Sequence, residues 1–212
     1  MAAINIPSEL AFLRDEFLRE AKVINAERGY ISVSSFNLRM NPVVLKSAAR
    51  VISTIFNDDQ IDTIHGIPHS GNYLATAVAI EMTTPVHLHA SRKDQNIPSN
   101  WKDVYREEIR SFTTSDEQLT VFSGINLSFV KKGDRVLILD DVCATGETGY
   151  RIIQGLQQRG VIVVGFAVLF DKVFQGGLEY IESLGVKTCS CVRVLEIGDH
   201  DKVVLAKQEE VV

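Results

Sequence analysis

The stretch "VLILDDVCATGETG", residues 136–149, joins four aliphatic residues to two adjacent acids and then to a short loop of small and hydroxyl-bearing residues. An uninterrupted aliphatic run is typical of a strand that a parallel sheet buries on both faces. In an open α/β sheet, ligands bind beyond the carboxyl ends of the strands. We therefore expect Asp140 and Asp141 to stand at the ligand-binding edge of an α/β domain.

The loop after the two acids has the composition of a phosphate-binding turn. "CATGETG" leads into "YRIIQGLQQRG", an expected helix whose N-terminus offers unpaired N–H groups and a partial positive charge. Small residues let the backbone wrap a phosphate, and Thr145 and Thr148 add hydroxyl donors. Carboxylates accept hydrogen bonds from vicinal hydroxyls and help to hold a hydrated Mg²⁺. The stretch therefore predicts a ligand with a phosphate and vicinal hydroxyls, namely a phosphorylated ribose.

The stretch has two other interpretations. An acid pair followed by Thr145 or Thr148 as an ordinary helix cap needs no ligand, and it stays open for the acid pair alone. The acid-ended strand of a P-loop NTPase would require the pattern G-x-x-x-x-G-K-[ST], which the chain does not contain. The added loop composition favours the ribose phosphate.

Strand-like and helix-like segments alternate through most of the chain, which predicts an α/β fold. The expected helices are 7–22, with Ser8 as N-cap, 41–56, with Asn41 as N-cap and Pro42 at the first helical position, 73–82, about 147–159 and about 176–184. The expected strands are 30–36, 61–67, 85–90, 135–140, 161–169 and 187–194, with 105–112 as a further candidate. This order predicts an open twisted, mainly parallel sheet with helices on both faces.

The length of 212 residues suits a single domain. We expect residues 1–40 to form an N-terminal helix and a small hood, and residues 41–212 to form the core. The long polar excursion at 91–118 is poorly periodic, and such a segment inside a compact domain is usually functional or mobile.

Composition excludes several classes of protein. A formal charge of −5 provides no basic field, so we expect no nucleic-acid partner. No apolar run is long enough for a membrane span, and the start has no pattern of a signal peptide. The cysteines are odd in number, and Cys189 and Cys191 would lie about 7 Å apart along one strand, which suits a disulfide poorly. We therefore expect a reduced, cytoplasmic chain.

"VLILDDVCATGET" resembles the phosphoribosyl-pyrophosphate (PRPP) motif of the type I phosphoribosyltransferases, an aliphatic strand, two acids and a loop A-T-G-x-T. The resemblance implies that Asp140 and Asp141 hold the ribose hydroxyls. It also implies a cradle for the 5-phosphate, made by Ala144, Thr145, Gly146, Glu147 and Thr148. Glu147 fills the variable loop position, so its side chain should point away from the phosphate.

A second loop suits the leaving pyrophosphate. "GIPHSGNYLA" lies between an expected strand and an expected helix, and Gly71 permits close approach of the backbone. The resemblance implies that His69, Ser70 and Gly71 bind pyrophosphate. A plain β–α turn with a helix cap is the alternative for this loop alone.

The polar excursion resembles the family's mobile loop over the reaction centre. At its start, Arg92 and Lys93 could meet pyrophosphate oxygens, although a solvated basic pair is the ordinary alternative. Tyr105 continues the same pattern. We expect Arg92 and Lys93 to take part in catalysis and the loop to close against water.

The acceptor base depends on "GFAVLFDKVFQGG", in which Lys172 ends a strand and precedes Phe174. An ammonium there can donate to an exocyclic carbonyl oxygen, and the ring can cover the base. An exposed lysine that begins a helix is the alternative from position alone. Adenine carries a 6-amino group that needs an acceptor, so Lys172 favours a 6-oxopurine.

Beyond the PRPP motif, the chain resembles the xanthine phosphoribosyltransferases of this family over almost its full length, from "SSFNLRMNPVVL" to the ending "DHDKVV". This implies that Lys172 meets the 6-oxo group and that Ile31 and Asn37 line the base pocket. Two features depart from that pattern. The ATGET loop is closer to adenine enzymes than to the A-N-G-Q-A form, and the region around Asn37 is one residue shorter.

The histidines have spacings that occur in zinc sites, His65 with His69 and His87 with His89. No cysteine or aspartate cluster accompanies them to complete a site. Core or surface histidines are the favoured interpretation, and we assign no zinc.

The sequence thus predicts Mg²⁺-assisted transfer of 5-phosphoribose from PRPP to a purine, with xanthine preferred and hypoxanthine or guanine as further candidates. A homodimer is expected from the family. Adenine and orotate phosphoribosyltransferases are the alternative enzymes. A PRPP- or purine-sensing transcription regulator is the alternative without catalysis, but residues 1–40 offer one clear helix and no basic recognition segment.

Overall fold

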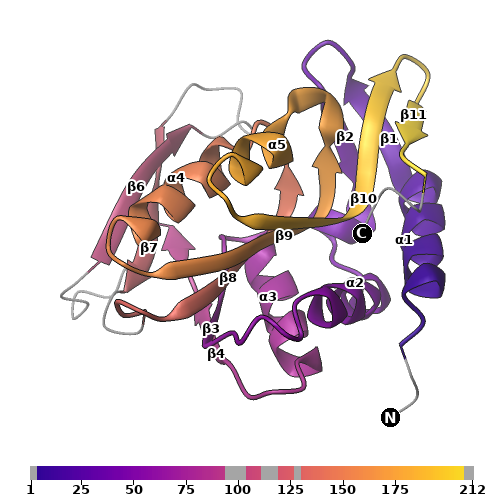
Figure 1. Cartoon of the computed structure of the whole chain (residues 1–212). Helices are drawn as coiled ribbons and strands as arrows, with labels where there is room; N and C mark the ends of the chain where they lie inside the picture. Colours follow the sequence, from indigo (N-terminus) through magenta and orange to yellow (C-terminus); the bar gives the residue numbers. More distant parts are fainter. Residues whose placement is uncertain (1–3, 94–103, 111–118, 127–129, 208–212) are drawn as a thin grey trace.

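The computed structural model describes residues 4–93, 104–110, 119–126 and 130–207 (Figure 1). Its helices are α1 (Ile6–Glu20), α2 (Pro42–Ile55), α3 (Ser70–Glu81), α4 (Glu147–Gln157) and α5 (Gly177–Glu182). The strands of the central sheet are β3 (Thr63–Gly66), β4 (His87–Ala90), β8 (Arg135–Cys143), β9 (Ile162–Lys172), β10 (Lys187–Gly198) and β11 (Lys202–Leu205). Within these ranges, no helix is long and apolar enough to cross a membrane.

The central sheet has six strands in the order β11-β10-β9-β8-β3-β4. All neighbours pair in parallel except the β10–β11 hairpin. The prediction of a mainly parallel sheet is therefore confirmed. Because parallel strands end at a common edge, the carboxyl ends of β3, β8 and β9 gather on one side of the molecule.

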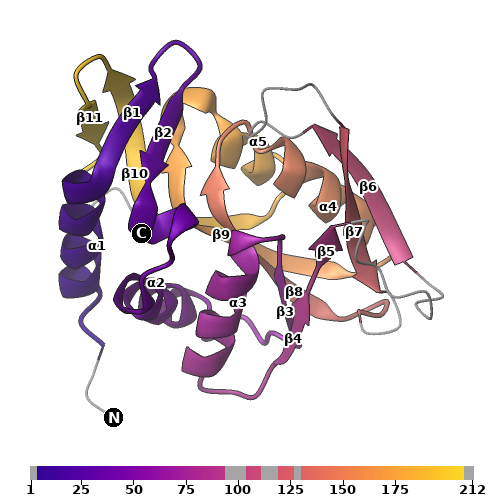
Figure 2. The ribbon, with the colours of Figure 1, turned by 180° about the vertical axis from the view of Figure 1, so that it is seen from behind.

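Alternate residues of β8 enter two separate cores. Leu137 and Leu139 pack into the core that α1, α2 and α3 share with the sheet. Val136 and Ile138 pack into the core under α4 and α5 on the opposite face. Successive side chains of a strand point to opposite faces, so an uninterrupted aliphatic run is required where helices cover both. Figure 2 shows the two helical layers with the sheet between them.

The start of the first helix differs from the prediction. The N-cap of α1 is Asn5, whose Oδ1 accepts from the backbone N–H of Ser8 at 3.2 Å. Ser8, which was expected to cap the helix, lies inside it. Asn41 caps α2 and accepts from Val43 N at 2.9 Å, with Pro42 as the first helical residue. That second prediction is confirmed.

The N-terminal hood is a hairpin of β1 (Ala21–Asn25) and β2 (Tyr30–Val33), followed by a π-helical turn, η1 (Ser34–Leu38). The predicted strand 30–36 is therefore wrong after Val33, and the predicted helix 7–22 ends two residues early. The β10–β11 hairpin supports the hood, because Asp201 Oδ1 accepts from Val23 N at 2.7 Å. Both ends of the described chain thus build the hood (Figure 1).

A second, antiparallel sheet has the order β5-β7-β6 and stands at the edge of the core beside α4 (Figure 2). Its strands are β5 (Arg92–Lys93), β6 (Val104–Arg110) and β7 (Leu119–Asn126). The candidate strand at 105–112 is confirmed in β6, and β7 was not predicted. The remainder of the excursion at 91–118 lies outside the described residues.

Candidate active site

Asp140 and Asp141 lie at the carboxyl end of β8, where the site begins. Both are half-buried, and the backbone N–H of Asp141 donates to Asp140 Oδ1 at 2.9 Å. Burial, followed by the neighbouring Asp141 charge, raises the pKa of Asp140 well above its ordinary value. Burial also raises the pKa of Asp141. Hydroxyl donors or a cation from a ligand would stabilise the charged forms of these two acids.

The loop that is predicted to bind phosphate runs from Ala144 through Thr145 to the start of α4. Gly146 is the N-cap in the left-handed region, with φ of 75°, and its carbonyl accepts from Tyr150 N at 2.8 Å. The first helical N–H groups, at Glu147 and Thr148, follow directly and point out of the helix end. The loop therefore presents backbone donors beside the two acids.

The charged side chain of Glu147 lies away from the loop. Its carboxylate Oε1 accepts from Arg151 Nη2 at 2.6 Å, one helical turn further along α4. The side chain thus runs along the helix, away from the loop, in agreement with the expectation for the variable position.

The loop rests against the glycine pair that follows η3 (Val173–Gln175). A Cβ added to Gly177 would lie 2.2 Å from the Ala144 carbonyl oxygen and 2.7 Å from Gly146 N. A Cβ on Gly146 would lie 2.3 Å from the Gly177 carbonyl oxygen. Gly177 is not among the site residues predicted from the sequence, where its one signal is the "GG" pair after "KVFQ".

The second loop packs on the first acid. Ile67 N donates to Leu139 O at 2.9 Å, and the Pro68–His69 peptide is cis. A Cβ on Gly71 would lie 2.8 Å from Asp140 Cα. His69 is the N-cap of α3 and Ser70 its first residue, so backbone N–H groups of a second helix end open beside the acid pair.

The residues predicted to bind the base come from β9 and the hood. Lys172 ends β9 and is half-buried, and burial lowers its pKa. Phe174, in η3, is 41% exposed. The hood's turn meets this segment, since a Cβ on Gly29 would lie 3.0 Å from the Phe174 ring.

The two hood residues differ in their surroundings. Ile31 is buried in the core shared by α1, α2 and α3. Asn37 lies in η1, and its backbone oxygen accepts from Ser70 Oγ at 3.1 Å. Its side-chain Oδ1 is buried and accepts no hydrogen bond from the described part of the chain. This acceptor lies beside the loop 69–71, and a buried oxygen without a partner gains a hydrogen bond from any donor that reaches it.

Three further predicted residues lie in strands of the second sheet. Arg92 and Lys93 form β5, which pairs with β7 through the backbone, and Tyr105 lies in β6. Their side chains lie outside the described residues.

Asp171 is a buried acid that sequence analysis missed. It is the register partner of Cys143 on β8 and of Arg193 on β10, and its Oδ1 lies 3.6 Å from Arg193 Nε. Burial raises the pKa of Asp171 to about 6, against partial lowering by Ser190 and Arg193. The apolar run around it gave no sign of a charge inside the sheet, directly before Lys172.

His65 and His89 form a buried pair across β3 and β4, with their Nδ1 atoms 3.0 Å apart and their rings stacked. Burial, then His89, lowers the pKa of His65, and burial lowers that of His89 to about 4, so both rings are neutral near pH 7. His87 is exposed on the same edge strand. Throughout the described ranges, no three His, Cys, Asp or Glu residues gather in a way that could hold a metal ion.

The model of the phosphoribosyl transferase domain matches residues 35–197 of the chain. Xanthine phosphoribosyltransferases are similar in sequence. That of Bacillus thuringiensis (strain Al Hakam) is 26% identical over 188 residues, 88% of this chain and 91% of the relative. That of Bacillus cereus (strain AH187) is 26% identical over 198 residues, 93% of this chain and 96% of the relative.

Adenine phosphoribosyltransferases are similar in structure. The enzyme of Rhodothermus marinus DSM 4252 gives a TM-score of 0.66 at 21% identity, over 86% of this chain and 99% of that one. The Trypanosoma brucei enzyme, in complex with AMP, pyrophosphate and ribose-5-phosphate, gives 0.67 at 20% identity, over 89% and 83%. At this identity the likeness concerns the fold.

Proposed function

Because the chain belongs to the phosphoribosyl transferase domain family, we propose that it is a purine phosphoribosyltransferase of purine salvage. It transfers 5-phosphoribose from PRPP to a ring nitrogen of a 6-oxopurine, preferably xanthine, and releases pyrophosphate. One observation carries the proposal: Asp140 and Asp141, the loop 144–148, the loop 69–71 and Lys172 all lie at the carboxyl ends of adjacent strands.

In this reaction the site residues bind PRPP and align it with the purine, and no covalent nucleophile is needed. Asp140 and Asp141 accept hydrogen bonds from the ribose hydroxyls and stabilise positive charge as the bond from C1 to pyrophosphate breaks. The backbone donors of 144–148 hold the 5-phosphate, and those of 69–71 hold the leaving pyrophosphate. With both ends of the donor fixed, C1 faces the acceptor nitrogen, and alignment supplies much of the catalysis.

We also propose Mg²⁺ as the cofactor, and the donor set fits it. Asp140 and Asp141 are hard oxygen ligands, and their raised pKa values mark a place where a cation stabilises the charged forms. Two acids fill few of the positions around such an ion, so most oxygen ligands would come from PRPP and water. When bound, the ion neutralises charge that develops on pyrophosphate.

The preference for a 6-oxopurine rests on Lys172. Its half-buried ammonium, with a pKa lowered by burial, needs an acceptor nearby, and a 6-oxo group provides one. The sequence relatives are named for xanthine. Adenine is the competing base, because the ATGET loop is closer to that of adenine enzymes.

The decisive measurement is turnover of PRPP with Mg²⁺ and, separately, xanthine, hypoxanthine, guanine, adenine and orotate. We expect nucleotide from the 6-oxopurines, most of all from xanthine. In Lys172→Ala, kcat/KM for the preferred oxopurine should fall about tenfold or more, because a charged hydrogen bond is lost. Lys202→Ala, which removes an exposed lysine paired with Glu196, is the matched control and should change little.

Each alternative gives a different result in this assay. Turnover of adenine alone would refute the role of Lys172. Turnover of orotate alone would assign the other enzyme class. PRPP binding without nucleotide from any base would favour the regulator.

We propose a reducing, cytoplasmic setting. The cysteines at 143, 189 and 191 are free and buried. Burial raises the pKa of Cys189 to about 12, so this thiol stays protonated and unreactive.

We propose that the working unit is a homodimer and that its interface covers the α2–α3 face. Val43, Tyr73 and Ile80 are 59%, 57% and 76% exposed there. They flank or line a groove of about 410 Å³ that also includes Leu45 and Ala77. The groove also contains Lys46 and Glu81, whose opposite charges can pair across a two-fold axis. A mainly apolar face of this kind suits an isologous contact with a second copy.

Ile80→Glu should convert the dimer to a monomer, because it places a charge in the apolar groove of both copies. Light scattering after gel filtration at micromolar concentration measures the mass. Leu18→Glu, at an exposed apolar position on α1, is the helical control and should remain dimeric. A monomeric wild type, or a variant with unchanged mass, would contradict the interface.

A further inference from the structure

The π-helical turn η1 carries Asn37 towards the site and is held at both ends. Within the turn, Arg39 N donates to Ser34 O at 2.7 Å and Asn41 N donates to Ser35 O at 3.0 Å. These bonds pair the N–H groups that follow the turn with the carbonyl groups at its start. The N–H groups at the start of the turn have no carbonyl partner of their own, as at any helix start.

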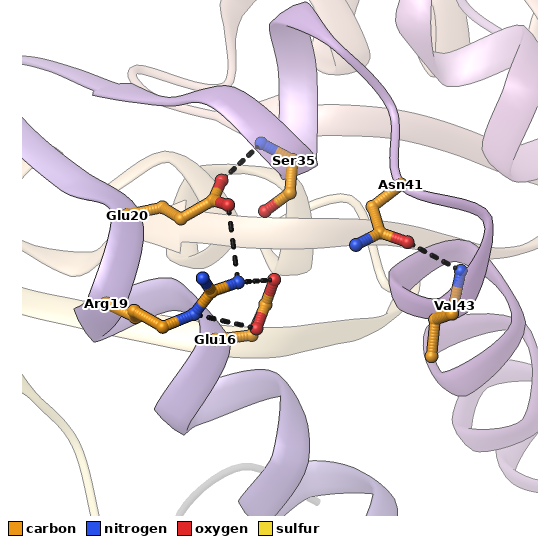
Figure 3. Close-up of polar contacts among 6 residues, drawn as sticks. All are labelled: Glu16, Arg19, Glu20, Ser35, Asn41 and Val43. Carbon is orange, nitrogen blue, oxygen red and sulfur yellow. Dashed lines mark hydrogen bonds and ion pairs between the residues drawn. The ribbon is translucent and has the colours of Figure 1, made fainter.

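Glu20 supplies the missing partner. It is the last residue of α1, and its Oε2 accepts from the Ser35 backbone N–H at 2.7 Å (Figure 3). Ser35, through its side chain and then its N–H, lowers the pKa of Glu20, so the turn selects the carboxylate. The hydrogen bond that holds the turn is the one from the N–H, since Ser35 Oγ has no hydrogen-bond partner in the described structure. Ser35 is buried, whereas Glu20 keeps 26% of its side chain exposed. A charge-assisted bond to a buried N–H therefore fixes where η1 begins.

The other side of the turn reaches the pyrophosphate loop. Asn37 O accepts from Ser70 Oγ at 3.1 Å, which joins η1 to the first residue of α3. Between the two anchors, the Asn37 Oδ1 atom is buried and has no donor in the described structure. The turn thus holds an acceptor in place at a fixed distance from the loop on which pyrophosphate is proposed to sit.

We infer that Glu20 is a positioning residue for the acceptor base: it anchors η1 through Ser35 and so presents the Asn37 carboxamide to the purine. The inference rests on the proposed function. Glu20 itself touches no substrate. Loss of its carboxylate should affect the PRPP half of the site much less. The loop 69–71 meets η1 through the Ser70 hydroxyl, whereas the backbones of the loops 69–71 and 144–148 pack on Asp140 and Gly177.

The test compares Glu20→Ala and Glu20→Gln with wild type in steady-state assays that vary base and PRPP separately. Glu20→Ala should raise KM for the preferred base about tenfold, the size expected for a charged hydrogen bond. PRPP affinity, measured by calorimetry without base, should change less than about twofold. Glu20→Gln keeps an oxygen that can accept from Ser35, so it should recover part of the base affinity.

Glu16→Ala is the matched control. Glu16 lies one turn earlier on α1 and also pairs with Arg19, but within the described structure its ion pair stays on α1 and does not reach η1 (Figure 3). It should leave both KM values unchanged. A merely structural role for Glu20 would lower stability and kcat for every base alike; a positioning role lowers the selectivity between bases.

The outcomes separate the inference from the function on which it rests. If wild type forms no nucleotide with any purine, the proposed function fails. If wild type is active and Glu20→Ala has a normal KM for base, only the positioning role fails. Equal losses of base and PRPP affinity would also overturn it.

Discussion

Asp140→Asn should lower kcat by about 100-fold or more and, at the same time, raise the melting temperature of the ligand-free protein. The carboxylate is proposed to accept from the ribose and to stabilise positive charge, and an amide carries no charge for the second task. In the free protein the same charge is unfavourable. Burial and Asp141 raise the pKa of Asp140, so its charged form is disfavoured in the fold.

The sign of the pH dependence follows from that shift. A carboxyl whose folded pKa exceeds its unfolded pKa contributes stability below the unfolded pKa and loses it as pH rises through the folded value. Wild type should therefore lose stability across this window, whereas Asp140→Asn should not. Thermal melts at several pH values between 5 and 8 should show a gap of about 2–4 °C that widens with pH.

Asp134→Asn provides the control for this pair of effects. Asp134 precedes the opposite end of β8 and accepts from Lys131 N at 2.7 Å, a bond that an asparagine oxygen can keep. Asp134→Asn should be active, and its melting temperature relative to wild type should not rise with pH. If Asp140→Asn turned over PRPP at the wild-type rate, the assignment of the acid pair would be wrong. A variant less stable than wild type at pH 8 would contradict the electrostatic account.

The sequence was most informative where local and tertiary requirements agree. β8 could be predicted because burial on both faces demands an aliphatic residue at every position, and Val136 to Leu139 meet that demand. The start of α2 could be predicted because Asn41 and Pro42 cap the helix with their own atoms. In such places a few consecutive residues carry the whole signal.

The errors lie where a distant segment decides the outcome. The alternation in 30–36 predicts a strand, but residues 34–38 form a π turn, in which the Ser35 N–H donates to Glu20, fifteen residues earlier in the chain. Asn5 and Ser8 are both good caps, and α1 uses Asn5, whose side chain accepts from the Ser8 N–H. The burial of Asp171 could not be predicted from the sequence, because its partner, Arg193, comes from another strand.

The candidate site consists of two parts that are built in different ways. The part proposed for PRPP is built from strand ends and from glycines that touch backbone, at Gly71 and at the Gly146–Gly177 contact. The part proposed for the base is built from a hairpin, a π turn and side-chain bonds. Backbone packing fixes the first part, whereas the second can change its side chains without moving the strands. Such a division permits a change of base specificity while the part proposed for PRPP keeps its geometry.

Gly177→Ala should test the fixed part most directly, by raising the dissociation constant for PRPP about 100-fold or more. Its Cβ would stand 2.2 Å from the Ala144 oxygen and 2.7 Å from both Gly146 N and Cys143 Sγ. Two of these three atoms are backbone atoms of the phosphate loop, so the loop must move. Because its N–H groups are proposed to hold the 5-phosphate, a displacement of about 1 Å is enough to lose the alignment.

Gly198→Ala is the control, since its Cβ would come no closer than 3.4 Å to the flexible Lys202 side chain. It should bind PRPP as wild type does. Calorimetry with PRPP gives the dissociation constants, and a melt of each variant shows that the fold is kept. A Gly177→Ala protein that melts normally and binds PRPP with unchanged affinity would show that the 5-phosphate does not depend on this loop. The cradle would then have to be sought at the other helix end, on the loop 69–71.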